Sequence, residues 1–168
     1  QYASADNMTE QLSALSCLLN IGAGQPETAA FYDQWQANSL VIDKWFGLQA
    51  SHAAPDAAVA TAQALATHKD FDWKNPNRFR ALIAGFGLMN PAGFHDATGG
   101  GYAFFTDWLI RLDPLNPQTT ARMCGAFETW RRYDANRQSM MRVQLERLAA
   151  KPDLSRDTSE MVERILKG

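Results

Sequence analysis

The 168-residue sequence has few of the residues from which metal and nucleophile sites are built. It contains two cysteines and three histidines, and neither an H-E-x-x-H nor a C-x-x-C spacing occurs. Zinc sites need their ligands at such spacings, and His52, His68 and His95 do not share one helical face. We therefore predict no metal ligand, no cofactor and no catalytic residue in this chain, and we interpret the histidines as capping or loop residues.

The sequence also lacks the features of an exported or membrane-bound protein. No apolar run reaches the roughly 18 residues of a membrane-spanning helix, and no signal-peptide pattern occurs. Cys17 and Cys124 lie far apart, each in an apolar helical context, which excludes a disulfide framework and favours buried free thiols in a reducing compartment. We therefore expect a cytoplasmic protein with no membrane partner.

No excess of positive charge is present, since 16 basic and 18 acidic residues give a net charge of −2. This balance argues against a nucleic-acid partner. Trp130–Tyr133 mixes basic and aromatic residues, but Glu128 and Asp134 beside it favour local ion pairs. Gly99–Gly101 precedes a predicted helix, but no strand comes before it and no Lys-Ser/Thr follows. We therefore predict that the three glycines form a flexible turn rather than a phosphate-binding loop.

Strand signals are absent, because no segment alternates apolar and polar residues up to a hairpin turn. Helix starts are frequent instead: Asn75-Pro76, Asn90-Pro91 and Asn116-Pro117 each combine a strong N-cap with a residue suited to the first helical position. The apolar spacing predicts helices over 7–19, 27–35, 39–48, 55–68, 76–88, 101–112, 117–131, 135–149 and from 156, and a short one from 91. About nine helices with short connections predict an all-α, armadillo- or HEAT-like superhelical stack of antiparallel helices.

No linker or low-complexity segment divides the chain, so we expect a single helical domain over residues 1–168. The sequence opens on Gln1 without an initiator methionine, and we expect it to be part of a longer polypeptide. A shortened helical stack leaves its terminal layer uncovered. We therefore expect Leu12, Leu15 and Phe31 to be exposed.

One group of polar residues suggests a binding site. Gln118 and Arg122 are four residues apart and so share a helical face, while Arg78 and Arg80 flank the apolar stripe of an earlier predicted helix. An arginine fork donates two parallel hydrogen bonds to a carboxylate. Arg80, Gln118 and Arg122 therefore form a candidate donor cluster for a peptide backbone or carboxylate. The alternative, which geometry alone favours, is that they are interhelical ion pairs or solvated surface residues.

Six segments carry a resemblance to a known family. In chain order they are Asp6–Thr9, Leu40–Ser51, His68–Phe86, Asn90–His95, Asn116–Arg122 and Arg132–Arg137. Together they resemble the C-terminal helical domain of bacterial aminopeptidase N, the alanyl aminopeptidases, over almost the whole chain. These zinc metallopeptidases remove N-terminal amino acids from peptides.

The family's zinc helix and its Gly-x-Met-x-Asn exopeptidase motif are missing here. The resemblance therefore implies the C-terminal portion of a longer aminopeptidase, with the zinc ion in a catalytic domain outside these residues. In the family this domain caps the active-site cavity, and Arg80, Gln118 and Arg122 match positions that line its channel on the leaving-product side. The implied partners are the catalytic domain of the same polypeptide and peptide substrates. The alternative is a free-standing helical-repeat module that binds a protein.

Overall fold

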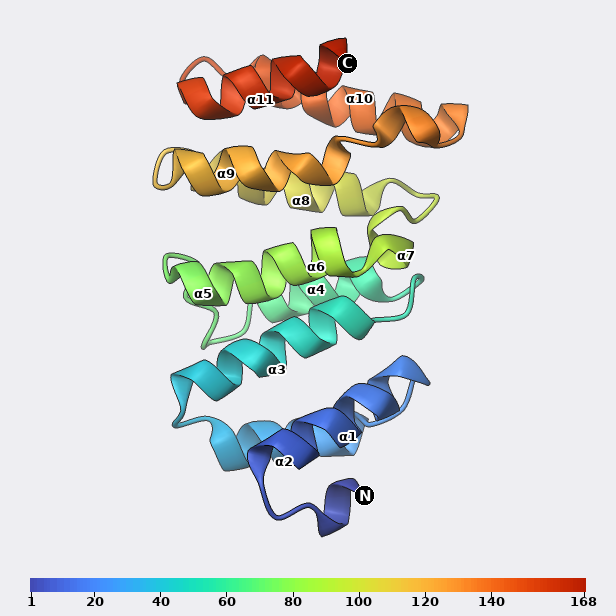
Figure 1. Ribbon diagram of the computed structural model, residues 1–168, viewed down its shortest axis with the longest axis vertical. Helices are drawn as coiled ribbons and strands as arrows, with labels where there is room; N and C mark the ends of the chain where they lie inside the picture. The colour runs from blue at the N-terminus through green and yellow to red at the C-terminus, as the bar shows by residue number, and fades with distance from the viewer. The chain divides into compact units, whose positions relative to one another are not determined.

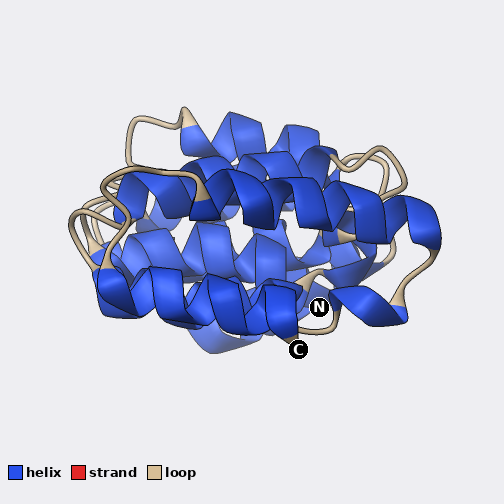
Figure 2. Cartoon of the chain, turned by 90° about the horizontal axis from the view of Figure 1, so that it is seen from above, coloured by secondary structure: helices blue, strands red, loops and turns tan.

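The computed structural model describes residues 1–168 and is helical throughout. Helices contain 73% of the residues and no strand is present (Figures 1 and 2). This confirms the all-α prediction. The chain divides into two compact units, Gln1–Gly93 and Phe94–Gly168. That the two units make up a single domain stays a prediction.

The first unit is a succession of short helices joined by tight loops (Figure 1). Its elements are η1 (Tyr2–Ser4), α1 (Met8–Asn20), α2 (Gln25–Trp35), α3 (Ser39–His52), α4 (Ala58–Ala66), α5 (Pro76–Phe79), the π-helical segment η2 (Arg80–Ala84) and α6 (Gly85–Met89), and α7 (Pro91–Phe94) follows. The predicted helix over 76–88 is thus one run with a π-helical middle. The alanine-rich helix starts later than predicted, because residues 55–57 form a turn before Ala58.

Asparagine side chains start several of these helices, as the sequence indicates. Asn7 Oδ1 accepts the Glu10 N–H at 3.0 Å, Asn38 Oδ1 accepts the Val41 N–H at 3.3 Å, and Asn75 Oδ1 accepts two first-turn N–H groups. Each cap satisfies a backbone donor that the helix itself leaves unpaired. Gly24 precedes α2 with φ +91°, a left-handed conformation that glycine adopts without strain.

Asn90 is an N-cap that also joins two elements of the first unit. Its Oδ1 accepts the Gly93 N–H at 3.0 Å, while its Nδ2 donates to the carbonyl oxygens of Ala50 and Ala53 at 3.1 and 2.9 Å. The side chain is buried, and it satisfies carbonyl groups at the end of α3 that have no intrahelical partner.

The exposure expected for the first helices is wrong. Leu15 is 1% exposed and Phe31 is 0% exposed, while Leu12 is half-buried. The reason is that α1, α2 and α3 contact one another, and this packing buries Leu15 and Phe31. The large apolar side chains that face solvent lie at other positions: Ile21, Leu40, Leu88, Met89, Leu115 and Val143.

The second unit contains α8 (Gly100–Leu112), α9 (Pro117–Met123), η3 (Cys124–Phe127), η4 (Trp130–Arg132), α10 (Ala135–Ala149) and α11 (Arg156–Lys167). The predicted helix over 117–131 is therefore only partly α-helical, since the chain tightens into 3₁₀ turns from Cys124. Asn116 caps α9 as predicted, and Asp134 and Ser155 cap α10 and α11.

Helix α11 is fastened at both of its ends. The buried carboxylate of Asp113, at the end of α8, accepts hydrogen bonds from Ser155 and Thr158 at the start of α11. At the other end Trp130 Nε1 and Arg131 Nη1 each donate to the Ile165 carbonyl at 3.0 Å. Residues outside α11 therefore bind side chains at its start and a carbonyl group at its end.

The cysteine prediction is half right. Both thiols are free, and Cys124 is buried, but Cys17 is exposed. In α1 the buried face carries Gln11, Ala14 and Leu15, and Cys17 points away from it. No helix of the chain is long and apolar enough to cross a membrane.

Candidate functional site

Gln118 and Arg122 occupy an exposed face of α9. Asn116 caps this helix through the Thr119 N–H at 3.1 Å, and the four-residue spacing places the two side chains one above the other. Both are exposed, and neither side chain takes part in a hydrogen bond, an ion pair or a ring contact within the chain. Beyond them, a Cβ added at Gly125 would meet no atom within 4 Å. This face thus offers unpaired amide and guanidinium donors in open space.

Arg80 lies in the first unit, at the start of the π-helical segment η2. Its side chain is exposed, and its Nη2 donates to the Asn77 Oδ1 at 2.8 Å. Because Asn77 is neutral, the charge of Arg80 has no counter-ion within the chain. The convergence of Arg80 with Gln118 and Arg122, which belong to the other unit, stays a prediction.

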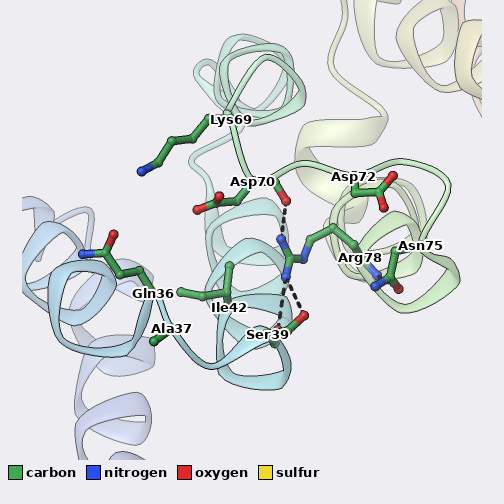
Figure 3. A pocket seen from close by; sticks show the side chains of 9 residues that line it. All are labelled: Gln36, Ala37, Ser39, Ile42, Lys69, Asp70, Asp72, Asn75 and Arg78. Atoms are coloured by element: carbon green, nitrogen blue, oxygen red, sulfur yellow. Dashed lines mark hydrogen bonds between the residues drawn. The ribbon is translucent and has the colours of Figure 1, made fainter.

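Arg78, predicted to flank the same apolar stripe as Arg80, has a different role. It is only 5% exposed, and its Nε donates to the Asp43 Oδ1 at 2.5 Å. Nη1 donates to the Asp70 carbonyl and Nη2 to the Ser39 carbonyl at 3.1 Å (Figure 3). All three nitrogens are therefore engaged, and Arg78 joins α5 to α3 and to the loop before α5 rather than offering donors to a ligand.

A cavity of about 390 Å³ lies beside Arg78 (Figure 3). It is lined by Gln36, Ala37, Ser39, Ile42, Lys69, Asp70, Asp72, Asn75 and Arg78. Its polar groups serve the fold: Asn75 caps α5, the Asp72 Oδ1 accepts the Lys74 N–H at 3.0 Å, and Asp70 accepts the Tyr32 hydroxyl. The last bond, together with burial, raises the pKa of Tyr32. We interpret this cavity as a structural polar cluster.

The histidines at positions 68 and 95 lie in aromatic surroundings. The His95 ring stacks on Tyr133 with 4.0 Å between ring centres, and its Nδ1 lies 2.9 Å from the Tyr102 hydroxyl. Burial, with a smaller contribution from the charge of Arg137, lowers the pKa of His95 to about 4. Burial also lowers the pKa of His68, whose ring packs against Tyr32 and against two further aromatic rings.

No three His, Cys, Asp or Glu side chains of the chain are grouped closely enough to hold a metal ion. The candidate residues Arg80, Gln118 and Arg122 are exposed hydrogen-bond donors, and the two arginines carry positive charge.

The comparisons with known proteins identify the family. A family model described as a domain of unknown function with ARM repeats, DUF3458_C, matches residues 1–167. The chain belongs to this family. The armadillo-like arrangement predicted from the spacing of the helices is thereby confirmed.

Three curated relatives of this DUF3458_C domain are aminopeptidases N, each 40% identical to it. They come from Caulobacter vibrioides, Haemophilus influenzae and Escherichia coli, and the alignments cover 98%, 99% and 99% of the chain. The match lies in the C-terminal part of these proteins, and the chain spans 19% of the length of each. The resemblance found in the sequence is confirmed.

A solved structure agrees with this result. The crystal structure of Legionella pneumophila aminopeptidase A in complex with aspartic acid superposes on the chain with a TM-score of 0.88 at 34% identity. The superposition covers 99% of this DUF3458_C domain and 20% of the Legionella chain. Neither comparison tests the roles of Arg80, Gln118 and Arg122.

Proposed function

We propose that the chain is the C-terminal helical part of a cytoplasmic zinc aminopeptidase, which removes N-terminal amino acids from peptides. The observation that carries this proposal is the 40% identity, over the whole chain, to the C-terminal part of three aminopeptidases N. In such an enzyme this domain walls the active-site chamber, restricts entry to short peptides or unfolded ends, and contacts the peptide beyond the scissile bond. Its partners are then the catalytic domain of the same polypeptide and the peptide substrates.

The chemistry of the exposed donors supports a role in peptide binding. A peptide presents carbonyl oxygens and a terminal carboxylate on the leaving side of the scissile bond. The amide of Gln118 donates to carbonyls, and the forks of Arg80 and Arg122 suit carboxylates. Because all three side chains are exposed and none has a charged partner within the chain, a ligand would displace only water or, at Arg80, a neutral amide.

The zinc ion of the proposed reaction does not belong to this domain. The chain offers no donor set for it, so we assign no chemical step to these residues. Their contribution is to bind and orient the part of the peptide that does not react, which affects catalysis through positioning.

The test uses the complete reading frame that contains this chain. We expect its product to release N-terminal residues from tripeptides and from alanyl p-nitroanilide, and to lose both activities on treatment with a chelator. A product that lacks these residues should lose tripeptide hydrolysis more than anilide hydrolysis. A reading frame without an H-E-x-x-H motif, whose product has no chelator-sensitive activity, would favour a free-standing protein-binding module instead.

A further inference from the structure

A cavity of about 510 Å³ lies in the first unit, among the ends of four helices. The end of α1, the start of α2, the end of α3 and the start of α4 contribute to its lining, and these ends lie on the same side of the first unit in Figure 1. We call it the Trp45 cavity and define it by six of the residues that line it: Ala29, Trp45, Gln49, His52, Ala57 and Thr61. Its volume is in the range of sites that hold small molecules.

The lining of the Trp45 cavity is uncharged and rich in alanine. None of the residues that line it is an Asp, Glu, Lys or Arg, and five are alanines. Because alanine side chains are short, they leave the space open and give it apolar walls. A charged ligand would find no counter-ion there, and burying an unpaired charge is costly. The lining therefore favours an uncharged ligand.

Trp45 gives the cavity a rigid aromatic wall. Its side chain is only 7% exposed, and its Nε1 donates to the Thr28 carbonyl oxygen at 2.9 Å. The ring also contacts the rings of Tyr32 and Phe46, each with 5.0 Å between ring centres. These contacts fix the indole ring before a ligand arrives, which lowers the cost of ordering it on binding. Since aromatic pairs gain stability beyond the area that they bury, this wall favours an aromatic ligand.

His52 is held in one orientation beside the cavity. Its Nδ1 lies 2.9 Å from the Leu48 carbonyl oxygen and 2.8 Å from the Ser51 hydroxyl, and its Nε2 lies 3.0 Å from the Ser16 hydroxyl. Because a carbonyl oxygen can only accept, the neutral ring carries its proton on Nδ1, and Nε2 accepts from Ser16. Both nitrogens are therefore engaged, and His52 offers a ligand its ring but no free donor or acceptor.

Two polar groups of the cavity have no partner within the chain. Gln49 Nε2 donates to the Trp45 carbonyl oxygen at 3.2 Å, which orients the amide and leaves its Oε1 as a free acceptor. The side chain of Thr61 takes part in no hydrogen bond. Both residues are half-buried. An amide oxygen can only accept a hydrogen bond, so a ligand that fits Gln49 carries an N–H or an O–H group.

We propose that the Trp45 cavity binds a small, uncharged aromatic compound that carries one N–H or O–H group, of the indole or phenol class. The planar ring fills the space between Trp45 and the alanine walls, and its N–H or O–H donates to the Gln49 Oε1. This site is separate from Arg80, Gln118 and Arg122. It goes beyond the proposed function and does not depend on it.

The experiment titrates the 168-residue chain with indole and follows the backbone amide resonances by NMR. We expect shifts at the end of α1, the start of α2, the end of α3 and the start of α4. Benzofuran has the same shape but an oxygen in place of the N–H. It should bind about fivefold more weakly, because it leaves the Gln49 Oε1 unpaired. Indole-3-acetate, which adds a carboxylate, should bind no better than indole.

Variants separate the acceptor from the apolar space. Gln49→Met keeps the length of the side chain but removes the acceptor, so indole and benzofuran should bind alike. Ala29→Leu adds a branched side chain to the cavity and should weaken indole binding about tenfold. Ala30→Leu is the matched control, since Ala30 is the next residue of α2, is equally exposed and does not line the cavity. It should leave indole binding unchanged, and a melting curve for each variant confirms that it is folded.

The proposal is overturned if the shifts lie away from these helix ends, if indole and benzofuran bind with equal affinity, or if Ala29→Leu and Ala30→Leu bind indole alike. Stronger binding of indole-3-acetate than of indole would overturn the uncharged ligand. Calorimetric titration of the product of the complete reading frame with indole repeats the test in the longer polypeptide. Absence of binding there would show that another segment fills the cavity, and would also overturn the proposal. Peptidase activity of that product is a separate measurement, so the two proposals fail independently.

Discussion

Asp113 binds Ser155, the N-cap residue of α11, which lies 42 residues later in the chain. Its Oδ2 accepts the backbone N–H of Ser155 at 2.8 Å, and its Oδ1 accepts the Ser155 hydroxyl at 2.6 Å. The carboxylate is completely buried, and the Thr158 hydroxyl donates to it as well, at 2.6 Å. A negative charge at this place also interacts favourably with the positive end of the α11 dipole.

Replacing Asp113 with alanine should therefore destabilise the protein strongly. The change leaves the buried Thr158 hydroxyl, the half-buried Ser155 hydroxyl and the Ser155 N–H without this acceptor. We expect a loss of about 3 kcal/mol in the free energy of unfolding. Urea denaturation measures it. Asp107→Ala on the same helix removes an exposed partner of Arg147 and should cost less than about 1 kcal/mol. Equal losses in the free energy of unfolding for the two variants would contradict a stabilising role of Asp113 at the start of α11.

The buried ion pair of Arg78 and Asp43 gives a second stability prediction. Arg78→Ala leaves a partly buried carboxylate unpaired and should cost about 3–5 kcal/mol. The double change Arg78→Met with Asp43→Leu removes both charges and should recover much of this loss. Thermal and urea unfolding of the three proteins test this. A double variant no more stable than the single one would show that the other hydrogen bonds of Arg78 matter more than the charge pair.

The two thiols should differ sharply in reactivity. Burial, with a smaller contribution from the nearby charge of Asp113, raises the pKa of Cys124 to about 12. Almost no Cys124 thiolate therefore forms at pH 8. Cys17, in contrast, is exposed. Iodoacetamide should modify Cys17 and spare Cys124 in the folded protein, because thiolate and access control the reaction. Peptide mass spectrometry identifies the site. Modification of both cysteines at similar rates without denaturant would refute the burial of Cys124.

Acid should destabilise the protein partly through His95. Its pKa is about 4 in the folded chain and about 6.5 in an unfolded one, so between these values the unfolded state binds more protons. The free energy of unfolding should therefore fall as pH decreases from 6.5 toward 4. Since the ring is only half-buried, solvent screening reduces the effect to about 1–2 kcal/mol.

A proton NMR titration of the His95 ring checks the cause directly. A midpoint near 6.5 would rule out this contribution. His95→Gln should show a shallower dependence of unfolding on pH over the same range than the wild-type chain.

In the product of the complete reading frame, if it is the proposed aminopeptidase, Arg122→Ala should impair peptide hydrolysis more than anilide hydrolysis. A charge-assisted hydrogen bond is worth about 1.5–3 kcal/mol, which corresponds to roughly a ten- to hundredfold loss in kcat/KM for tripeptides. Arg122→Lys should recover only part of it, because an ammonium group cannot reproduce the fork. Arg142→Ala, at an exposed arginine of α10, is the control. Equal effects on peptides and anilides would show that Arg122 is a solvated surface residue with no role in peptide binding.

Local chemistry made much of the fold predictable. Each N-cap bond joins a side chain to a backbone N–H two or three residues later, as at Asn75, Asn116, Asp134 and Ser155. The residues next to one another in the sequence are therefore sufficient to predict where these helices begin. The burial of Leu15 and Phe31 was not predicted, because it depends on how α1, α2 and α3 pack together.

The same limit applies to the candidate site. Arg78 and Arg80 look alike in sequence. Arg78 is structural because of partners elsewhere in the chain, among them Asp43, 35 residues earlier, and Ser39. The close approach of Gly47 and Gly85 was also not predicted, because it requires two helices to pack against each other. Gln118 and Arg122 were found because a four-residue spacing alone places them on one face.

The double fastening of α11 has a consequence for how the protein opens. The last helix of a chain normally frays first, and its amides exchange with solvent through small local openings. Here Asp113 holds the start of α11 and Trp130 and Arg131 hold its end, so α11 cannot detach without also breaking contacts of the segments that follow α8 and η3. We therefore expect α11 to open as part of a cooperative unit, so that its amide exchange reports the unfolding of that unit rather than fraying.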